Sequence, residues 1–491
     1  MKRLKDILNQ TPIKQLIGPE DRKIAGLCQH SEQAGPDMLF AASWGRTVDG
    51  HLFIIDAIQK GAKVVLCQKL PETIDESVTY LLVKDTAEAL GLISANFYEH
   101  PTRSLNLIGV TGTNGKTTVT TLLYELFSKL GEKVAMLSTI TTKIADKESP
   151  STYTTPDVIS TNRHLSEAVK TGCTYAFMEV SSHGINQKRI AGLNFKGGVF
   201  TNITHDHLDY HKTFQNYLST KKNFFDRLAK EAFALVNIDD KNALVILQNS
   251  RAEKRSYALK KPADYKAKIL EKSFEGSKLL IDGQEFWTPL IGTFNVYNLL
   301  EVYGVATESG KDRREILIAM SSLKAVKGRF QQVSSPTGIR IIIDYAHTPD
   351  ALKNVLETIR EIRKDRKQLI CLIGCGGNRD QKKRPIMAQI ACEKSDLIIL
   401  TSDNPRYEDP EKILDEMERG LSVQYRKKIL RITERKEAIK TAIALAKAGD
   451  IILIAGKGHE TYQEIKGIRQ KFDEMKIVET FLSILEKQRG K

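Results

Sequence analysis

Residues 105–118 read Leu-Asn-Leu-Ile-Gly-Val-Thr-Gly-Thr-Asn-Gly-Lys-Thr-Thr. The first six form an apolar run that predicts a buried strand, and a helical pattern then extends to Leu130, where Gly131 closes it. A strand that runs through a glycine-rich turn into a helix is typical of phosphate-binding loops. The backbone N–H groups of the turn and the positive end of the helix dipole can surround phosphate oxygens there. We therefore expect ATP to bind at this turn.

The Gly-Lys-Thr core of the turn supplies the chemistry that a bound nucleotide needs. Lys116 is predicted to reach the terminal phosphates, and the Thr117 hydroxyl is a ligand for Mg²⁺. The match to the Walker pattern is imperfect, because its first glycine would fall at Val110 and Gly109 is one place early. The alternative is a glycine-rich turn with a structural role only. The residues expected to contact ATP are Gly112, Thr113, Asn114, Gly115, Lys116, Thr117 and Thr118.

Strands and helices alternate along the rest of the chain. At 491 residues the chain is too long for one hydrophobic core. Continuous apolar strands, such as 369–373 and 451–455, are separated by amphipathic helices, which indicates parallel sheets covered on both faces. We predict an α/β protein of three domains: residues 1–100, a central ATP-binding domain with a P-loop-type parallel sheet at 101–333, and a Rossmann-like domain at 334–491.

Composition places the chain among ordinary globular enzymes. Hydrophobic residues make up 41% and charged residues 27%. Charged residues interrupt positions 1–10, so we expect no signal peptide, and no apolar run approaches the roughly 20 residues of a membrane span. The six cysteines are far apart in the sequence and lack metal-ligand spacing. We expect reduced, mostly buried thiols in a cytoplasmic enzyme.

The formal net charge of +14 has three possible meanings. A nucleic-acid-binding protein could have this charge. The lysines are spread along the chain, often beside glutamates, which favours a solvated basic surface instead. A basic protein also suits a polyanionic small substrate. We therefore expect small-molecule substrates and no nucleic-acid partner.

Two predicted strands of the central region end in polar groups. Glu179 lies near the end of the apolar strand 175–180, where an unpaired carboxylate would be costly. The strand 198–203 runs into Thr-His-Asp-His-Leu-Asp-Tyr-His at residues 204–211. Carboxyl ends of parallel strands meet at one edge of a sheet, and a ligand site is expected there. The alternative for any single histidine is a loop residue without a function.

The helix that follows contains a lysine on its apolar face. At 100° per residue, the apolar stripe comprises Phe214, Tyr217, Leu218, Phe224, Phe225 and Leu228. Lys221 falls at the centre of this stripe, and Lys222 falls at its edge. Lys221 either extends its ammonium to the surface along the apolar face or is chemically modified or deprotonated.

Several further motifs follow in a fixed order. With the phosphate-loop turn they are 111–117, Thr154-Thr155-Pro156, 178–184, 206–211, Gly292-Thr293-Phe294-Asn295, Gly328-Arg329-Phe330, 344–349, Asp403-Asn404-Pro405-Arg406 and 456–460. Through these motifs the chain resembles, over nearly its whole length, the Mur ligase family, which builds the peptide of bacterial peptidoglycan.

The resemblance implies roles around ATP and magnesium. Lys221 matches a lysine that becomes carbamylated, which turns a buried amine into a carboxylate-like ligand. Glu179, His207 and this carbamate would hold one Mg²⁺, and Thr117 would ligate another. The residues that would contact adenine, ribose and phosphates are Asn295, Arg329, Asp344 and His347.

The resemblance also implies substrates. An acyl phosphate forms on the D-glutamate γ-carboxylate of UDP-N-acetylmuramoyl-L-alanyl-D-glutamate, and meso-diaminopimelate then displaces phosphate. The first domain would bind the UDP moiety, although its stretch reads His30-Ser31-Glu32 where the family usually has Asp-Ser-Arg. The residues that would bind the muramoyl-dipeptide are Ser31, Thr154, Thr155, Ser182 and Arg189.

The amino acid is expected at the third domain. Arg406 could bind the distal carboxylate of diaminopimelate through two parallel hydrogen bonds; alternatively it pairs with Glu408 or Asp409. The residues expected to help are Arg379, Asp403, Asn404, Gly456 and Glu460. The remaining alternatives are the same ligase using L-lysine, a folylpolyglutamate-synthase-like amide ligase, and a P-loop switch or nucleic-acid-dependent ATPase. We expect a monomer.

Overall fold

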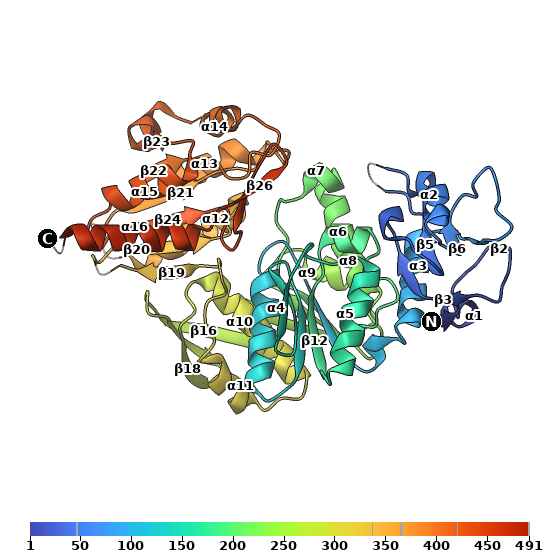
Figure 1. Cartoon of the computed structure of the whole chain (residues 1–491). Helices are drawn as coiled ribbons and strands as arrows, with labels where there is room; N and C mark the ends of the chain where they lie inside the picture. The colour runs from blue at the N-terminus through green and yellow to red at the C-terminus, as the bar shows by residue number, and fades with distance from the viewer. Residues whose placement is uncertain (46–47, 336, 364–366, 420, 490–491) are drawn as a thin grey trace.

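The computed structural model describes residues 1–491 except 46–47, 336, 364–366, 420 and 490–491. The chain forms three lobes in sequence order, from blue through green and yellow to red in Figure 1. Mostly parallel sheets with helices packed on them form each lobe, so the predicted α/β class is confirmed. None of the described helices is long and apolar enough to cross a membrane.

A five-stranded sheet forms the first lobe. Its strand order is β2 (Gln15–Ile17), β7 (Thr79–Leu82), β6 (Val64–Cys67), β5 (Met38–Ala41) and β4 (Gly26–Cys28), and only β2 is antiparallel to its neighbour. Its helices are α1 (Leu4–Ile7), α2 (Ile54–Gln59) and α3 (Thr86–Phe97), and β1 (Lys2–Arg3) pairs with β3 (Lys23–Ile24).

The central lobe contains the predicted strand, turn and helix. Its sheet runs in the order β11 (Lys147–Pro150), β10 (Thr141–Ile144), β9 (Val134–Leu137), β12 (Tyr175–Glu179), β8 (Asn106–Thr111), β13 (Gly197–Phe200), β14 (Phe233–Asn237), β15 (Glu253–Ala258), β16 (Tyr265–Lys272), β17 (Ser277–Ile281) and β18 (Gln284–Thr288). The strands from β9 to β16 are parallel, and the two strands at each edge are antiparallel additions.

Helices cover both faces of this central sheet. One apolar cluster packs α4 (Lys116–Lys129), α10 (Thr293–Glu308) and α11 (Arg313–Met320) against the strands. A second cluster lies under α5 (Val158–Lys170), α8 (Phe214–Asp226) and α9 (Ala243–Leu247). The short helices α6 (Ser182–Asn186) and α7 (Leu208–His211) follow the carboxyl ends of β12 and β13. Two buried faces explain why the central strands read as continuous apolar runs.

The third lobe is a six-stranded sheet with helices on both faces. Its order is β19 (Gln331–Ser334), β20 (Arg340–Asp344), β24 (Ile451–Ala455), β21 (Leu369–Ile373), β22 (Leu397–Leu400) and β23 (Ile429–Arg431), and only β19 is antiparallel. Its helices are α12 (Pro349–Ile362), α13 (Lys383–Lys394), α14 (Pro410–Glu418), α15 (Arg435–Leu445) and α16 (Glu474–Arg489), and β25 (Tyr462–Ile465) pairs with β26 (Ile468–Lys471).

Strand β19 bears on the boundary between the second and third domains. Gln331 pairs with Ile343 of β20, so the chain enters the third sheet before residue 334. Just before this strand, Gly328 O accepts from the backbone N–H of Tyr345 at 3.0 Å, and Phe330 packs in the apolar core of the third lobe. We propose to move the predicted boundary from 333/334 to just before Gly328, and to keep the other boundary near residue 100.

The first lobe contacts the central lobe through α3. A Cβ on Gly91 of α3 would lie 2.4 Å from the Cβ of Ala191, so the two backbones approach as closely as a glycine permits. Beside this contact, Lys188 lies 2.7 Å from Asp85 and 2.8 Å from Glu88. Close apolar packing and ion pairs therefore join these two lobes.

A fully buried ion pair ties the third lobe together. Arg435 of α15 donates to Glu474 of α16 at 2.7 Å, and both side chains are fully inaccessible. Arg435 also donates to the carbonyl oxygens of Ala455 at 2.8 Å and Ser402 at 3.3 Å. The guanidinium thus joins the carboxyl ends of β22 and β24 to the covering helices.

We predict that Arg435→Met lowers the free energy of unfolding by about 3–5 kcal/mol, because Glu474 is left as an unpaired buried carboxylate. The double variant Arg435→Met/Glu474→Met should recover most of this loss, because both charges are then gone. Urea denaturation followed by circular dichroism measures both values. An unchanged midpoint for the single variant would contradict the assigned role of the pair.

Candidate active site

The turn between β8 and α4 needs glycine at two positions. A Cβ on Gly112 would lie 1.9 Å from Thr201 Oγ1, and one on Gly115 would lie 2.8 Å from Asn298 Oδ1. Gly115 also has a φ of 91°, in the region that favours glycine. The turn therefore leaves a cradle of backbone N–H groups at the start of α4, which fits phosphate oxygens.

Two lysines from separate elements converge on one carbonyl of this turn. Lys116 Nζ donates to Gly112 O at 3.0 Å and Thr113 O at 2.9 Å. Lys221 Nζ, from α8, donates to Gly112 O at 2.7 Å and lies 4.7 Å from the ring centre of Tyr217. The two cations are close neighbours where a polyphosphate would place negative charge.

Lys221 is buried, as its place on the apolar stripe predicts, and it does not reach the surface. Its exposed fraction is 1%. Burial, followed by the charge of Lys116, lowers the pKa of Lys221 well below its usual value. Lys222 instead forms an ion pair with Asp226 at 2.7 Å along the same helix. The helix-face argument therefore separates the two adjacent lysines correctly.

Glu179 is fully buried at the end of β12 and is paired through hydroxyl groups. Its Oε2 accepts from Thr117 Oγ1 at 3.1 Å and from Thr139 Oγ1 at 3.0 Å. Its Oε1 accepts from Thr139 N at 2.7 Å. A carboxylate and the phosphate-loop hydroxyl thus lie side by side, and both are oxygen donors of the kind that Mg²⁺ prefers.

His207 is the N-cap residue of α7 and has a left-handed conformation with a φ of 55°. Its ring lies 4.9 Å from the ring of His183, and its Nε2 is 3.3 Å from Asp206 Oδ2. Burial lowers the pKa of His207 to about 4, so its imidazole is neutral near pH 7, as metal coordination requires. Among the described residues, no three His, Cys, Asp or Glu side chains form a metal-binding group. The further ligands that the family resemblance implies are a carbamate on Lys221 and the Thr117 hydroxyl.

Residues of the third lobe reach the phosphate loop. Arg329 Nη2 donates to Thr117 Oγ1 at 3.2 Å, and Asn114 Nδ2 donates to Asp350 Oδ2 at 3.1 Å. Asp344 accepts backbone N–H groups from Phe330 at 2.6 Å and Ala346 at 2.7 Å. The predicted nucleotide residues Arg329 and Asp344 therefore lie at the junction of two lobes.

His347 follows β20 at the same junction. Its Nδ1 is 2.9 Å from the carbonyl oxygen of Tyr345, and burial lowers its pKa to about 4. Lys383 donates to its backbone carbonyl at 2.8 Å. Asn295 lies in α10, where it donates to Ile291 O at 2.8 Å and accepts from Asn298 at 3.0 Å; Asn298 in turn borders Gly115 of the phosphate loop.

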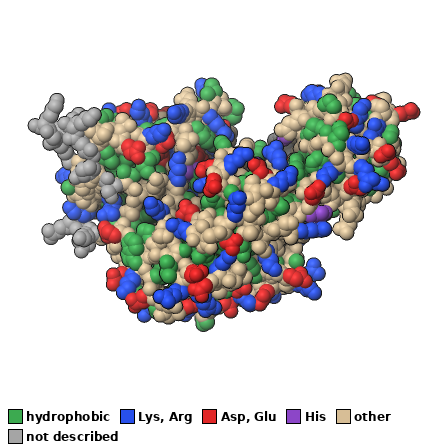
Figure 2. Space-filling view, turned by 60° about the horizontal axis from the view of Figure 1, so that its bottom comes forward, with side chains coloured by type: hydrophobic (Ala, Val, Ile, Leu, Met, Phe, Trp, Pro, Cys, Tyr) green, Lys and Arg blue, Asp and Glu red, His purple; other side chains and the backbone are tan. Residues whose placement is uncertain are grey.

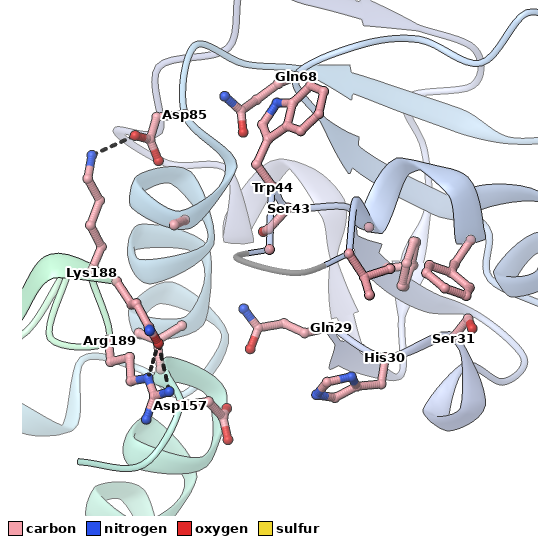
Figure 3. Close-up of a pocket in the computed structure, with 18 of the residues that line it drawn as sticks. Gln29, His30, Ser31, Ser43, Trp44, Gln68, Asp85, Asp157, Lys188 and Arg189 are labelled. Carbon is pink, nitrogen blue, oxygen red and sulfur yellow. Dashed lines mark hydrogen bonds and ion pairs between the residues drawn. The ribbon is translucent and has the colours of Figure 1, made fainter. Parts of the chain in front are cut away.

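A cleft of about 930 Å³ separates the first lobe from the central lobe (Figure 3). Of the predicted substrate residues, Ser31 and Arg189 line it. Arg189 donates to Thr155 O at 2.7 Å and stacks over Tyr153 at 4.7 Å. Gln29, Trp44 and Gln68 enter from the first lobe, opposite Arg189 (Figure 3). The cleft is large enough for a nucleotide-sugar and is lined from both lobes.

The other predicted acceptor residues lie between this cleft and Glu179. Thr154 Oγ1 lies 3.0 Å from Thr139 Oγ1. Thr155 is buried, and its hydroxyl donates to Glu179 O at 2.8 Å and lies 3.0 Å from Ser181 Oγ. Ser182 Oγ lies 3.0 Å from His211 Nε2. These hydrogen-bonded residues link the cleft to Glu179, the carboxylate beside the phosphate loop.

A second polar cluster forms at the carboxyl ends of β22 and β24. Asn404 Nδ2 donates to Glu460 Oε2 at 2.9 Å. A Cβ on Gly456 would lie 2.7 Å from Asp403 Oδ2, so this close approach requires glycine. Four of the predicted amino-acid residues are therefore brought together here.

Arg406 borders this cluster in a left-handed conformation with a φ of 52°. Its Nη1 donates to Gly377 O at 2.8 Å, and its Nε lies 3.8 Å from Glu464 Oε2. The alternative partner Glu408 is occupied by the buried Arg384, at 2.8 Å. A Cβ built on Gly376 would lie 2.9 Å from Arg406 Nη1 and 3.8 Å from Cγ of the exposed Arg379, so the two arginines flank the same glycine.

Sequence reasoning missed several residues that the structure places at these sites. Thr139 donates two hydrogen bonds to Glu179, and Lys457 is buried beside Glu460. Tyr153 and Trp44 line the cleft. An isolated threonine or aromatic residue gives no periodic signal. Lys457 was detectable, because it follows an apolar strand within the motif 456–460.

Comparison with known proteins matches all three lobes. Three family profiles cover the chain: "Mur ligase family, catalytic domain" at residues 23–98, "Mur ligase middle domain" at 110–306 and "Mur ligase, glutamate ligase domain" at 328–458. The chain belongs to the Mur ligase family. The predicted resemblance is thereby confirmed, and the phosphate-loop turn lies inside the middle-domain match.

Mur ligases of known name and structure align along nearly the full chain. A relative from Cytophaga hutchinsonii, named UDP-N-acetylmuramoyl-L-alanyl-D-glutamate–2,6-diaminopimelate ligase, is 52% identical over 485 residues, covering 99% of this chain and 100% of the relative. A solved structure with the same name has a TM-score of 0.70 and 31% identity, covering 99% and 100% of the two chains. A MurF ligase from Thermotoga maritima in complex with ADP has a TM-score of 0.64 and 19% identity, covering 94% and 98%.

We predict that Lys221→Ala nearly abolishes turnover and that Lys222→Ala is mild. Lys221 is buried against the phosphate loop, whereas Lys222 contributes a helix-surface ion pair worth about 0.3–0.5 kcal/mol. Added acetate or formate should partly restore the Lys221→Ala enzyme by supplying a small carboxylate. Steady-state phosphate release measures both variants. Equal losses in the two variants, or a larger loss for Lys222→Ala, would contradict the helix-face assignment.

Proposed function

We propose that this chain is an ATP-dependent ligase that joins meso-2,6-diaminopimelate to the D-glutamate γ-carboxylate of UDP-N-acetylmuramoyl-L-alanyl-D-glutamate. This amide bond extends the peptide of peptidoglycan. The observation that carries the proposal is the full-length match, over all three lobes, to a relative that bears this name. The phosphate loop, the cleft of the first lobe and the polar cluster of the third lobe supply one site for each of three substrates.

The chemistry proceeds by transfer of the γ-phosphoryl group of ATP. The D-glutamate γ-carboxylate attacks the γ-phosphorus, ADP leaves, and an acyl phosphate forms. The neutral amine of diaminopimelate then attacks the acyl carbon, loses a proton and displaces inorganic phosphate. Lys116, at the start of α4, would contact the β- and γ-phosphates and stabilise their negative charge. Arg329 would reach the same phosphates from the third lobe.

Mg²⁺ bound with ATP would neutralise part of the negative charge where the two anionic reactants meet. The Glu179 carboxylate, the His207 imidazole and a carbamate on Lys221 would hold one Mg²⁺, and the Thr117 hydroxyl would ligate another. Carbamylation needs a neutral amine, and Lys221 is a buried amine next to a second cation. A carbamate would place a negative charge beside the Lys116 cation.

The acceptor substrate fits the cleft between the first two lobes. Ser31 lines the wall from the first lobe, and Arg189 faces it from the central lobe. Thr154, Thr155 and Ser182 would contact the dipeptide, whose terminal carboxylate must approach Glu179 and the phosphate loop. The exposed Glu32 stands in the motif that usually ends in arginine, so other groups of the cleft must provide its cationic contacts. Of the lysines and arginines that the structure describes, Arg189 and Lys188 line it.

The alternatives are less consistent with these features. A folylpolyglutamate-synthase-like ligase gives no role to the first-lobe cleft, and a nucleic-acid-dependent ATPase gives none to the third-lobe cluster. L-lysine lacks the distal carboxylate that Arg406 and Arg379 would bind.

We place the reaction in the cytoplasm, since ATP is the donor and all six cysteines are free and buried. The working unit in this proposal is a single chain.

An amine-dependence assay tests the proposal directly. Purified protein is mixed with ATP, Mg²⁺, the UDP-muramoyl-dipeptide and one member of a panel containing meso-diaminopimelate, L-lysine, L-ornithine and L-glutamate. Phosphate release should depend on both the dipeptide and meso-diaminopimelate, and mass spectrometry should show the tripeptide product. Preferred use of L-lysine would contradict the amino-acid assignment, whereas release without any amine would contradict ligation.

We predict that Lys116→Ala lowers kcat by about 100-fold or more, because a preorganised cation at the terminal phosphates is lost. Lys129→Ala, at the exposed far end of α4, is the matched control and should behave as wild type. Coupled measurement of ADP formation gives both values. Near-wild-type turnover of Lys116→Ala would refute the phosphate-loop assignment.

We predict that Arg406→Ala raises the KM for diaminopimelate by about 10- to 150-fold, the value of a charge-assisted contact worth about 1.5–3 kcal/mol. The KM for ATP should stay unchanged, and the preference over L-lysine should narrow. Arg469→Ala is the control, because its Nε also lies 3.8 Å from Glu464 Oε2 but its side chain is 65% exposed. An unchanged KM for diaminopimelate in Arg406→Ala would exclude the carboxylate contact.

A further inference from the structure

The ammonium group of Lys457 is buried within the polar cluster of the third lobe. Its side chain has no exposed surface. Its Nζ donates to Asn404 Oδ1 at 2.9 Å and to Glu460 Oε2 at 3.1 Å, and it lies 3.9 Å from Asp403 Oδ1. This buried cation therefore lies next to three of the residues assigned to the amino-acid substrate, and it is not exposed to solvent.

These contacts make the two oxygens of Glu460 different. Oε2 accepts from Lys457 and, at 2.9 Å, from Asn404 Nδ2. Oε1 lies 3.5 Å from the Tyr345 hydroxyl, at the outer limit of a hydrogen bond. A carboxylate oxygen can accept two hydrogen bonds, so Oε2 is saturated while Oε1 can accept a further donor.

Lys457 also sets the orientation of the Asn404 amide. Asn404 Oδ1 accepts from Lys457 Nζ and from the backbone N–H of Glu464, both at 2.9 Å. With two donors on the oxygen, the amide nitrogen must point to Glu460. Reversing the amide would place its N–H groups against an ammonium and a backbone donor, which is unfavourable.

We propose that Lys457 is a positioning residue that prepares Glu460 to bind the distal ammonium of the incoming diamino acid. This inference rests on the proposed function. Lys457 and Asn404 hold one carboxylate oxygen, and the other is left for the substrate. Asp403, whose Oδ2 borders Gly456, adds a second negative charge. With Lys457 as the only cation in direct contact with these two carboxylates among the described residues, the cluster has a net negative charge that one ammonium can balance.

In this proposal Lys457 and Arg406 serve different parts of the distal end of the diamino acid, the ammonium and the carboxylate. Arg406 lies at the Gly376–Gly377 side, where a carboxylate would bind, and Lys457 acts through Glu460 on the ammonium side. Loss of Lys457 should therefore weaken recognition of the distal amine. The same substitution should not change how much the distal carboxylate contributes to substrate binding.

A substrate comparison tests this role. L-2-aminopimelate keeps the reacting amine and both carboxylates of diaminopimelate but lacks the distal amine. For wild type and Lys457→Met, kcat/KM is measured with meso-diaminopimelate and with L-2-aminopimelate. The wild-type preference for diaminopimelate should narrow about tenfold or more in the variant, because the loss falls on the substrate with the ammonium. The KM values for ATP and the UDP-muramoyl-dipeptide should stay unchanged.

Two controls keep the result interpretable. Lys471→Met changes an exposed lysine of the neighbouring strand β26 and should leave the preference unaltered. Lys457→Gln retains a hydrogen-bond donor, so it should narrow the preference for diaminopimelate less than Lys457→Met does. If the methionine variant does not fold, the glutamine variant is used for the test instead. Equal losses with both amino acids would overturn the proposal, because a general structural defect does not distinguish them. Failure of the wild-type enzyme to use diaminopimelate would overturn the proposed function and this inference together.

Discussion

The Gly112 carbonyl, which accepts hydrogen bonds from two lysines, is the interaction on which the rest of the site depends. Lys116 comes from the first turn of α4, and Lys221 comes from α8, more than one hundred residues further along. Bringing both to one oxygen requires that α8 pack its apolar stripe against the sheet beside the phosphate loop. Local glycine geometry at 112–115 and the long-range packing of α8 are therefore one constraint.

From that point each lobe adds a component that the central lobe lacks. The first lobe closes one side of the cleft that we propose for the nucleotide-sugar, and the Gly91–Ala191 contact fixes it to the central lobe. The third lobe contributes Arg329 and Asp350 to the phosphate loop, and the cluster that we propose for the amino acid lies at its strand ends. Figure 2 shows the outer lobes separated by a notch above the central one, so substrates can enter between them.

The sequence predicted the fold class and several central strands of the sheets, because strands buried on both faces read as continuous apolar runs. The runs 369–373 and 451–455 coincide with β21 and β24. The edge strand β19 was missed because Gln331 and Gln332 carry no apolar signal. Periodicity also separated Lys221 from Lys222 correctly. Contacts between distant segments, such as Thr139 with Glu179 or Arg384 with Glu408, could not be predicted, since they depend on tertiary packing rather than on local spacing.

Two buried lysines show why burial alone does not define a role. Lys221 donates to a neutral carbonyl and faces the charge of Lys116, so its ammonium form is disfavoured. A neutral amine is the form that reacts with CO₂ to give a carbamate. Lys457 lies within 3.1 Å of one carboxylate and 3.9 Å of another, so its charge is compensated where it is. The cost of burying a cation is met by opposite charge in one case and by loss of the charge in the other. The partners, rather than the depth of burial, therefore distinguish the role that we propose for Lys221 at the metal site from the positioning role that we propose for Lys457.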